Sequence, residues 1–334
     1  MKKTWIWVLV GFLLLSAGMT AAGKNVSAKQ EPLRIVTTIF PEYEWVLEIL
    51  GEQAAAVQVT LLTDNGVDLH SFQPSVKDIV EISSCDLFVY VGGESDAWVK
   101  DALSGARNEN IVALNLLELL GEDAWEEELA EGMQEGAWEE ELTEGMQEGG
   151  REEEEAEYDE HVWLSLKNAS FFCEKIAEAL CELDPEHAQS YREHAADYQE
   201  KLAELDARYE DAAARAALDT LIFASRFPFR YLTEDYHLNY YAAFSGCEAD
   251  TEASFDTIVF LAGKTDELGI PVLLTIDGDD PKIAETVRDN TREKNQQILV
   301  MDSMQSTTSE DLKNGSTYLS VMERNLEVLE MALG

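Results

Sequence analysis

Residues 185–217 read PEHAQSYREHAADYQEKLAELDARYEDAAARAA, and this stretch decides the architecture of the chain. It contains no glycine and is dense in Ala, Glu, Leu, Arg and Gln, a composition that favours one long helix. Asp184 offers a cap and Pro185 suits the first turn. A helix of about 30 residues is roughly 45 Å long. We expect this rod to hold two lobes at a nearly fixed separation.

Short apolar segments alternate with helical segments on both sides of this rod. Candidate strands lie at 33–40, 55–62, 87–91, 220–224, 239–244, 272–276 and 297–301, and helices such as 254–268 and 282–291 separate them. Short apolar strands separated by helices are typical of parallel sheets that helices cover. The sequence therefore predicts an α/β fold of two lobes, each a parallel sheet flanked by helices, joined by the long rigid helix.

The first residues have the layout of a secretory signal. Two lysines precede an apolar run at 5–15, and small residues follow, with a plausible cleavage after Ala22. An uncleaved anchor is the alternative, but the run is shorter than the roughly 20 residues that a spanning helix needs. We expect an extracytoplasmic protein whose parts are a signal peptide at 1–23, a first lobe at 31–183, the joining helix at 184–217 and a second lobe at 218–334.

The net charge of −43 limits the possible partners. Binding of nucleic acid or of anionic lipid needs a basic face, so neither is expected. Cations are the natural partners of so acidic a chain. High charge can also serve solubility alone, so composition does not separate these two interpretations.

An acidic insert at 122–160 stands apart from the rest of the chain. It holds 19 acidic residues and one base, Arg151, and so supplies 18 of the 43 net negative charges. Within it, AWEEELAEGMQEG at 124–136 is followed directly by AWEEELTEGMQEG at 137–149. We interpret this tandem repeat as a duplicated loop, because it is too short for a solenoid unit. It is either a weak cation collector or a solvated spacer.

Cysteine usage gives no sign of a structural zinc knot. Cys85, Cys173, Cys181 and Cys247 include no C-x-x-C pair. A disulfide and buried free thiols both stay open as interpretations.

The chain has five histidines, and three of them have structural explanations. His187 and His194 lie seven residues apart on one face of the long helix, a spacing typical of a solvated face. His237 is placed at a turn or a helix end. None of the three is expected to bind a ligand.

The other two histidines lie in more informative places. His70 is in a loop that follows a strand and precedes a helix beginning near Ser75, and ligands of α/β proteins bind at such carboxyl ends of strands. His161 opens the helical stretch at 161–164. From spacing alone, each is a candidate ligand or a structural residue.

Three motifs around these histidines give the chain a family resemblance. DLHSFQP at 68–74, DEHVWL at 159–164 and DPK at 280–282 resemble segments of the metal-specific substrate-binding proteins of bacterial importers for zinc and manganese, the cluster A-I group. The resemblance runs from about residue 33 to the end, interrupted by the acidic insert. The insert also falls just before the second histidine, where zinc-selective members often carry a His-rich and acidic mobile loop.

The resemblance implies a metal site in the cleft between the lobes. His70 and His161 from the first lobe and Asp280 from the second would be the ligands. Two imidazoles and a carboxylate suit Zn²⁺, and Mn²⁺ tolerates the same set. The implied protein is a monomer that captures a divalent metal ion and delivers it to the membrane permease of an ABC importer, without catalysis.

One residue departs from the family pattern. The family usually places a histidine or glutamate ligand after a strand of the second lobe, and here Arg226 stands at that position. A guanidinium never deprotonates in proteins and cannot ligate. Water, a bidentate Asp280, Asp277 or a carboxylate of the insert would have to complete the site, or Arg226 would pair with Asp280.

Two other classes of function stay open as alternatives. An exported zinc-dependent hydrolase would also use two histidines and a carboxylate. The sequence contains no H-E-x-x-H, G-x-S-x-G or P-loop motif, which disfavours it. An acidic adhesin that buffers cations would depend mainly on the repeat. We expect a transport protein rather than an enzyme.

Overall fold

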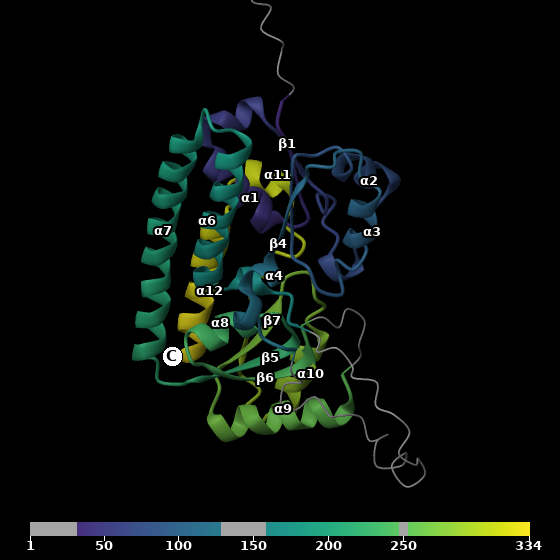
Figure 1. The fold of residues 1–334 in the computed structure, drawn as a ribbon. Coiled ribbons are helices and arrows are strands. Elements are labelled where there is room, and N and C mark those ends of the chain that lie inside the picture. The colour runs from purple at the N-terminus through teal and green to yellow at the C-terminus, as the bar shows by residue number, and fades with distance from the viewer. Residues whose placement is uncertain (1–31, 128–157, 247–252) are drawn as a thin grey trace, which may run out of the picture. The chain divides into compact units, whose positions relative to one another are not determined.

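The computed structural model describes residues 32–127, 158–246 and 253–334, and Figure 1 shows the arrangement of their helices and strands. The predicted signal peptide and most of the acidic repeat lie outside these residues. Contacts group residues 32–334 into one unit, so the two sheets described below belong to a single body.

Four parallel strands form the first sheet in the order β2-β1-β3-β4. The strands are β1 Arg34–Thr37, β2 Gln58–Leu61, β3 Leu87–Tyr90 and β4 Val112–Asn115. Between and after them come α1 Phe40–Leu50, η1 Gly51–Ala56, η2 Leu69–Ser71, α2 Val76–Ile82, α3 Val99–Ser104, α4 Leu116–Leu120 and η3 Gly121–Asp123. The parallel sheet is as predicted.

Local hydrogen bonds set the strand ends that the sequence prediction placed wrongly. The expected strand at 33–40 stops at Thr37, because the buried Glu42 carboxylate accepts bonds from Thr38 N (2.8 Å) and Ile39 N (3.3 Å) and so starts α1 at Phe40. Strand β4 was not expected at all. It passes into α4 without a Gly or Pro, and the side chain of Asn115 caps the new helix through Glu118 N.

The second sheet repeats the design with the order β6-β5-β7-β8, again all parallel. Its strands are β5 Thr220–Phe227, β6 Asn239–Ser245, β7 Val272–Ile276 and β8 Gln297–Met301. Its helices are α8 Arg230–Asp235, α9 Phe255–Leu268, α10 Lys282–Asn290, α11 Ser309–Lys313 and α12 Tyr318–Leu333. Two parallel four-stranded sheets flanked by helices therefore confirm the predicted fold class.

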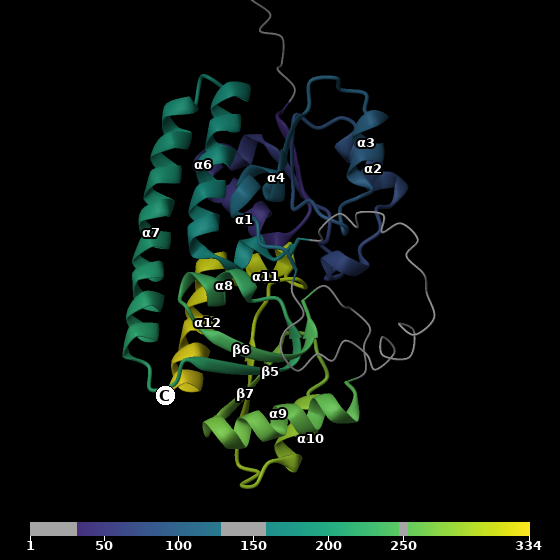
Figure 2. The ribbon, with the colours of Figure 1, turned by 60° about the horizontal axis from the view of Figure 1, so that its bottom comes forward.

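Strand β5 separates two layers of apolar packing. Leu221 and Phe223 belong to the main core, whereas Ile222 and Ala224 belong to a second cluster that includes Leu261 of α9. Successive strand residues point to opposite faces, so β5 is buried on both sides. Figure 2 shows α9 and α10 on one side of this sheet and α8 on the other.

The long helix α7 runs over Ala188–Arg215, after η4 Val162–Leu164 and α6 Leu166–Leu183. It begins three residues later than predicted. The Asp184 carboxylate accepts bonds from the Tyr191 hydroxyl (2.8 Å) and from His187 Nδ1 (2.7 Å), which holds residues 184–187 in a turn. The expected cap by Asp184 with Pro185 in the first turn is therefore wrong.

Helix α7 contacts the elements of both sheets. Its Tyr198 hydroxyl donates to Glu44 of α1 at 2.8 Å, and its Tyr209 hydroxyl donates to the Met322 carbonyl of α12 at 2.7 Å. Its buried residues recur at intervals of three and four along one face, namely Tyr191, Ala195, Tyr198, Leu202, Leu205, Tyr209 and Ala212. Figure 1 shows α7 beside α6 along one flank. The helix thus connects α1 of the first half of the chain to α12 of the second half.

Three cysteines, Cys85, Cys173 and Cys181, are buried free thiols, and Cys247 lies outside the described residues. Over 32–127, 158–246 and 253–334, no helix is both long and apolar enough to cross a membrane.

The buried Glu44 should make stability depend on pH. Burial raises its pKa from the ordinary value of 4.5 to about 8, although the Tyr198 hydroxyl opposes this. Between these two pH values the folded chain binds more protons than the unfolded chain, so stability falls as pH rises. We predict that Glu44→Gln makes the decline of the unfolding free energy between pH 5 and 7.5 shallower by about 1.4 kcal/mol per pH unit.

Urea unfolding at several pH values measures this slope. Glu48→Gln is the matched control, because Glu48 lies on the same helix but is 39% exposed. An unchanged slope in Glu44→Gln, or an equal change in the control, would contradict the prediction.

Candidate metal centre

His70 lies in the turn η2, between β2 and α2. Asp68 begins this turn, and its Oδ1 accepts a bond from the His70 backbone N–H at 3.0 Å. Ser75 then starts α2 with a capping box that includes Asp78. The loop is therefore fixed at both ends, and the His70 side chain is only 5% exposed.

His161 is held in the same way, next to η4. Asp159 Oδ1 accepts both the His161 backbone N–H at 2.8 Å and the ring Nδ1–H at 3.0 Å. The ring is fully buried and contacts the Trp163 ring, with 5.2 Å between centroids. On its other side, a Cβ added to Gly246 would lie 2.7 Å from the ring carbon Cε1.

The structure brings His70 and His161 together, with their Nε2 atoms 3.0 Å apart. The two rings are tilted by 58°, with centroids separated by 5.0 Å. Both nitrogens on the far sides of the rings are occupied. His161 Nδ1 faces Asp159, and His70 Nδ1 lies 2.8 Å from Ser95 Oγ and 3.3 Å from Glu160 Oε2.

Charge near the pair determines where the protons lie. Burial alone would raise the pKa of Glu160, but the bonds from His70 and Ser95 outweigh burial and hold it below the usual value. An ionised carboxylate only accepts hydrogen bonds, so Glu160 and Asp159 favour a proton on each Nδ1. In neutral imidazoles with Nδ1–H, both Nε2 lone pairs are available to a cation, whereas an Nε2–H on either ring would form a hydrogen bond across the 3.0 Å separation.

A divalent metal ion fits this arrangement. Zinc binds imidazole nitrogen at about 2.0–2.1 Å in tetrahedral geometry, which places two nitrogens roughly 3.3 Å apart. The observed Nε2 separation is within a few tenths of an ångström of that value. Carboxylates on the far nitrogens of metal-binding histidines also fix the tautomer and orient the rings. The histidine pair can therefore supply two ligands to zinc.

Asp280 lies apart from the histidine pair. Its carboxylate contacts the Lys282 ammonium and accepts the Lys282 backbone N–H at 3.1 Å, and its side chain is 56% exposed. The Lys282 partner holds the pKa of Asp280 below its usual value. In the described part of the chain, no group of three His, Cys, Asp or Glu is arranged to hold a metal.

Arg226 lies near the end of β5, and its partners differ from the one expected. Nη2 lies 3.0 Å from Asp68 Oδ2 and 3.6 Å from Asp279 Oδ1, so Asp280 is not its partner. Asp68 follows β2 of the first sheet, whereas Arg226 and Asp279 belong to the second half of the chain. Arg226 therefore forms an ion pair across the cleft.

Gln305 connects this ion pair to the histidines. In the amide orientation that satisfies its neighbours, its nitrogen donates to the Asp68 carboxylate (2.7 and 2.9 Å) and its oxygen accepts from His161 Nε2 at 3.0 Å when that nitrogen carries the proton. Gln305 is buried. The oxygen of Gln305 is thus a polar atom beside the position between the two histidines.

Sequence reasoning missed the residues that orient the histidines, although a signal was present. Both histidines stand two residues after an aspartate, as Asp68-Leu69-His70 and Asp159-Glu160-His161. In both, the aspartate accepts the backbone N–H of the histidine. Ser95 and Gln305 left no such signal, because only the folded chain brings them close.

The two ends of the acidic insert lie next to this site. Glu126 and Tyr158 form an antiparallel bridge, and Asp159 N donates to the Trp125 carbonyl at 2.9 Å. The Tyr231 hydroxyl of α8 accepts from Trp125 N and donates to the Asp159 carbonyl, both at 3.1 Å. The insert therefore joins the chain at the residue that orients His161.

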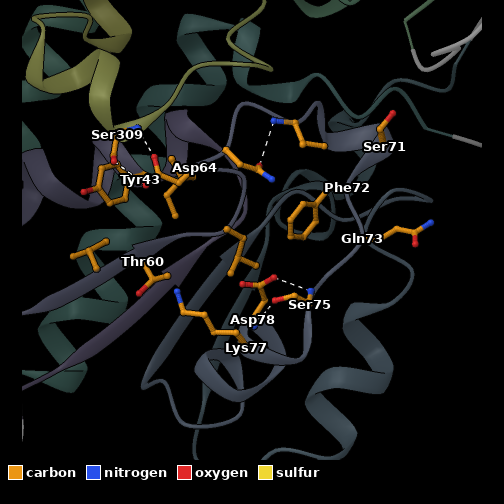
Figure 3. Close-up of a pocket in the computed structure, with 15 residues that line it drawn as sticks. Tyr43, Thr60, Asp64, Ser71, Phe72, Gln73, Ser75, Lys77, Asp78 and Ser309 are labelled. Carbon is orange, nitrogen blue, oxygen red and sulfur yellow. Dashed lines mark hydrogen bonds between the residues drawn. The ribbon is translucent and has the colours of Figure 1, made fainter.

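A separate cavity of about 780 Å³ lies beside the His70 loop. Figure 3 shows its lining, where the Asp64 carboxylate accepts bonds from Ser309 N (2.7 Å) and Ser309 Oγ (2.9 Å). Neither His70 nor His161 lines this cavity. It is distinct from the candidate metal centre.

The other histidines have local structural partners. His187 Nδ1 bonds Asp184 at 2.7 Å, and His194 Nδ1 lies 3.0 Å from the Ile49 carbonyl. His237 has a positive φ of 56° at the turn after α8. The predicted solvated face of the long helix is wrong, because His187 precedes α7 and His194 is partly buried against Ile49 of α1. The turn predicted at His237 is confirmed.

Comparisons with known proteins match most of the chain to a zinc-uptake family. Residues 35–332 match the family described as ZnuA, zinc-uptake complex component A, periplasmic. The chain is 28% identical over 337 residues to the zinc-binding protein AdcA of Streptococcus pyogenes, covering 99% of this chain and 62% of AdcA. It is 27% identical to the high-affinity zinc uptake system protein ZnuA of Bacillus subtilis, covering 100% of this chain and 99% of that protein.

A solved structure shares the fold. The Zn(II)-bound ZnuA-like domain of Streptococcus pneumoniae AdcA superposes with a TM-score of 0.68 at 27% identity, covering 90% of this chain and 99% of that domain. The chain spans about 62% of the length of the curated AdcA relatives that it matches.

Close packing at Gly246 generates a prediction about the His161 ring. A Cβ there would lie 2.7 Å from His161 Cε1 and 2.8 Å from the Phe227 carbonyl oxygen, and the backbone oxygen cannot yield easily. We predict that Gly246→Ala displaces the His161 ring and lowers the unfolding free energy by about 1–3 kcal/mol. The imidazole NMR signals report the ring, and denaturant unfolding reports the stability.

Gly263→Ala is the matched control. Gly263 lies inside α9 with open space around its Cα, so alanine there should stabilise the helix by about 0.5–1 kcal/mol. Equal effects of the two substitutions would show that the packing against His161 is not tight.

Proposed function

The chain belongs to the ZnuA family of periplasmic zinc-uptake components, and on that premise we propose that it captures Zn²⁺ between His70 and His161 and delivers it to the membrane permease of an ABC importer. The observation that carries this proposal is the pair of Nε2 atoms 3.0 Å apart, with both Nδ1 atoms held from behind. The zinc named in its relatives supports the choice of metal.

The proposed ligands are two imidazoles, with water completing the coordination. This set differs from a catalytic zinc, which usually has three protein ligands and one open position. The difference favours transport over the hydrolase alternative. Manganese is the second candidate metal, and it depends more strongly on oxygen ligands than zinc does.

Zinc capture outside the cytoplasm explains the other features of the chain. An acidic surface attracts cations and raises their concentration near the cleft. The signal-like first residues and the periplasmic place of the family support an extracytoplasmic protein. A repeat-based cation buffer is less favoured, because the family match runs over residues 35–332 and so covers far more of the chain than the acidic repeat.

We predict that His70→Ala and His161→Ala each weaken zinc binding by at least about 100-fold, because each removes one of two protein ligands. Competition with a chromophoric zinc chelator measures the constants. His187→Ala is the control, since His187 bonds Asp184 away from the site. Retention of one tight site in both histidine variants would refute the proposed ligands.

Asp280 stays a predicted ligand from the family resemblance. It would first have to release Lys282. The variant Asp280→Asn tests whether Asp280 is a ligand. An unchanged zinc affinity supports a site without Asp280, and a loss of zinc affinity of tenfold or more supports its recruitment on metal binding.

A further inference from the structure

The Arg226 guanidinium occupies carboxylate oxygens that would otherwise be available to a metal. Asp68 Oδ2 bonds Arg226 at 3.0 Å, and Asp279 Oδ1 lies 3.6 Å from the same nitrogen. These side chains are 12%, 21% and 25% exposed for Arg226, Asp68 and Asp279. The pairs are therefore only partly screened by water.

The remaining contacts of Asp68 are also filled. Oδ1 accepts the His70 backbone N–H at 3.0 Å, and the Gln305 amide donates to both oxygens. Asp68 is separated from His161 Nε2 by the single amide group of Gln305. Asp68 is thus a carboxylate close to the histidine pair that does not contact an imidazole nitrogen in this arrangement, and Arg226 restrains it.

From these contacts we infer that Arg226 is a metal-specificity residue, which withholds the carboxylate oxygens of Asp68 and Asp279 and leaves a nitrogen-only set of protein ligands. This inference rests on the proposed function of the histidine pair. Imidazole nitrogen suits zinc, whereas manganese prefers carboxylate, carbonyl and water oxygens. A guanidinium close to the site adds positive charge, which opposes any divalent ion that nitrogen does not bind strongly.

The proposal also explains why the described residues contain no three-membered group of metal-binding side chains. Asp68 and Asp279 serve as partners of Arg226, and Asp159 and Glu160 face the Nδ1 atoms of the histidines. The same ion pair joins the two halves of the chain without a metal ligand from the second half.

The test measures Zn²⁺ and Mn²⁺ affinities of the full chain by competition with a fluorescent chelator. In Arg226→Gln, Asp68 is released, so manganese affinity should rise at least tenfold more than zinc affinity does. Arg226→Lys keeps a cation for Asp68 and should retain the original ratio. In the double variant Arg226→Gln with Asp68→Asn, the released carboxylate is absent. The ratio of zinc affinity to manganese affinity should then return toward that of the unaltered chain.

An unchanged zinc-to-manganese ratio in Arg226→Gln overturns the inference, as does a shifted ratio that persists in the double variant. If Arg226→Gln fails to fold, the unaltered chain still tests the inference. A manganese affinity within tenfold of its zinc affinity would contradict a site whose protein ligands are nitrogen atoms only. Loss of zinc binding in the His70 and His161 variants, with no ratio change at Arg226, would retain the proposed function and reject only this inference.

Discussion

Two imidazole nitrogens held 3.0 Å apart, each with its far nitrogen engaged, form the interaction on which the rest of the structure depends. Neighbouring groups hold both histidines in this arrangement. Asp159 fixes one from its own loop, and Ser95 and Glu160 fix the other. The fold brings the loops of His70 and His161, which are far apart in the sequence, into this geometry.

The long helix α7 helps to hold the two histidine loops in place. Helix α7 bonds α1 through Tyr198 and α12 through Tyr209, so the two sheets do not depend on the cleft alone for their placement. Polar contacts also join the two halves of the chain: Arg226 pairs with Asp68, and the Trp163 indole donates to the Ser303 carbonyl at 2.9 Å.

The fold was largely predictable, because each element carried its own signal. Buried strands such as 272–276 appear as continuous apolar runs, and the glycine-free stretch around α7 has strong helix propensity. The ends were less predictable, since Glu42 and Asp184 redirect the chain through side-chain bonds that periodicity does not reveal. For the site, the motifs located His70 and His161, but Asp280 turns to Lys282, and the Arg226 partners depend on long-range packing that no local pattern encodes.

The most direct test of the central claim is X-ray absorption at the zinc edge, on protein loaded with one equivalent of zinc. The account predicts two imidazole ligands at about 2.0–2.1 Å, with the remaining positions filled by light oxygen scatterers. The imidazole signal should disappear in the variant that lacks both His70 and His161. A spectrum of oxygen ligands alone, or an imidazole signal that survives in that variant, would contradict the account.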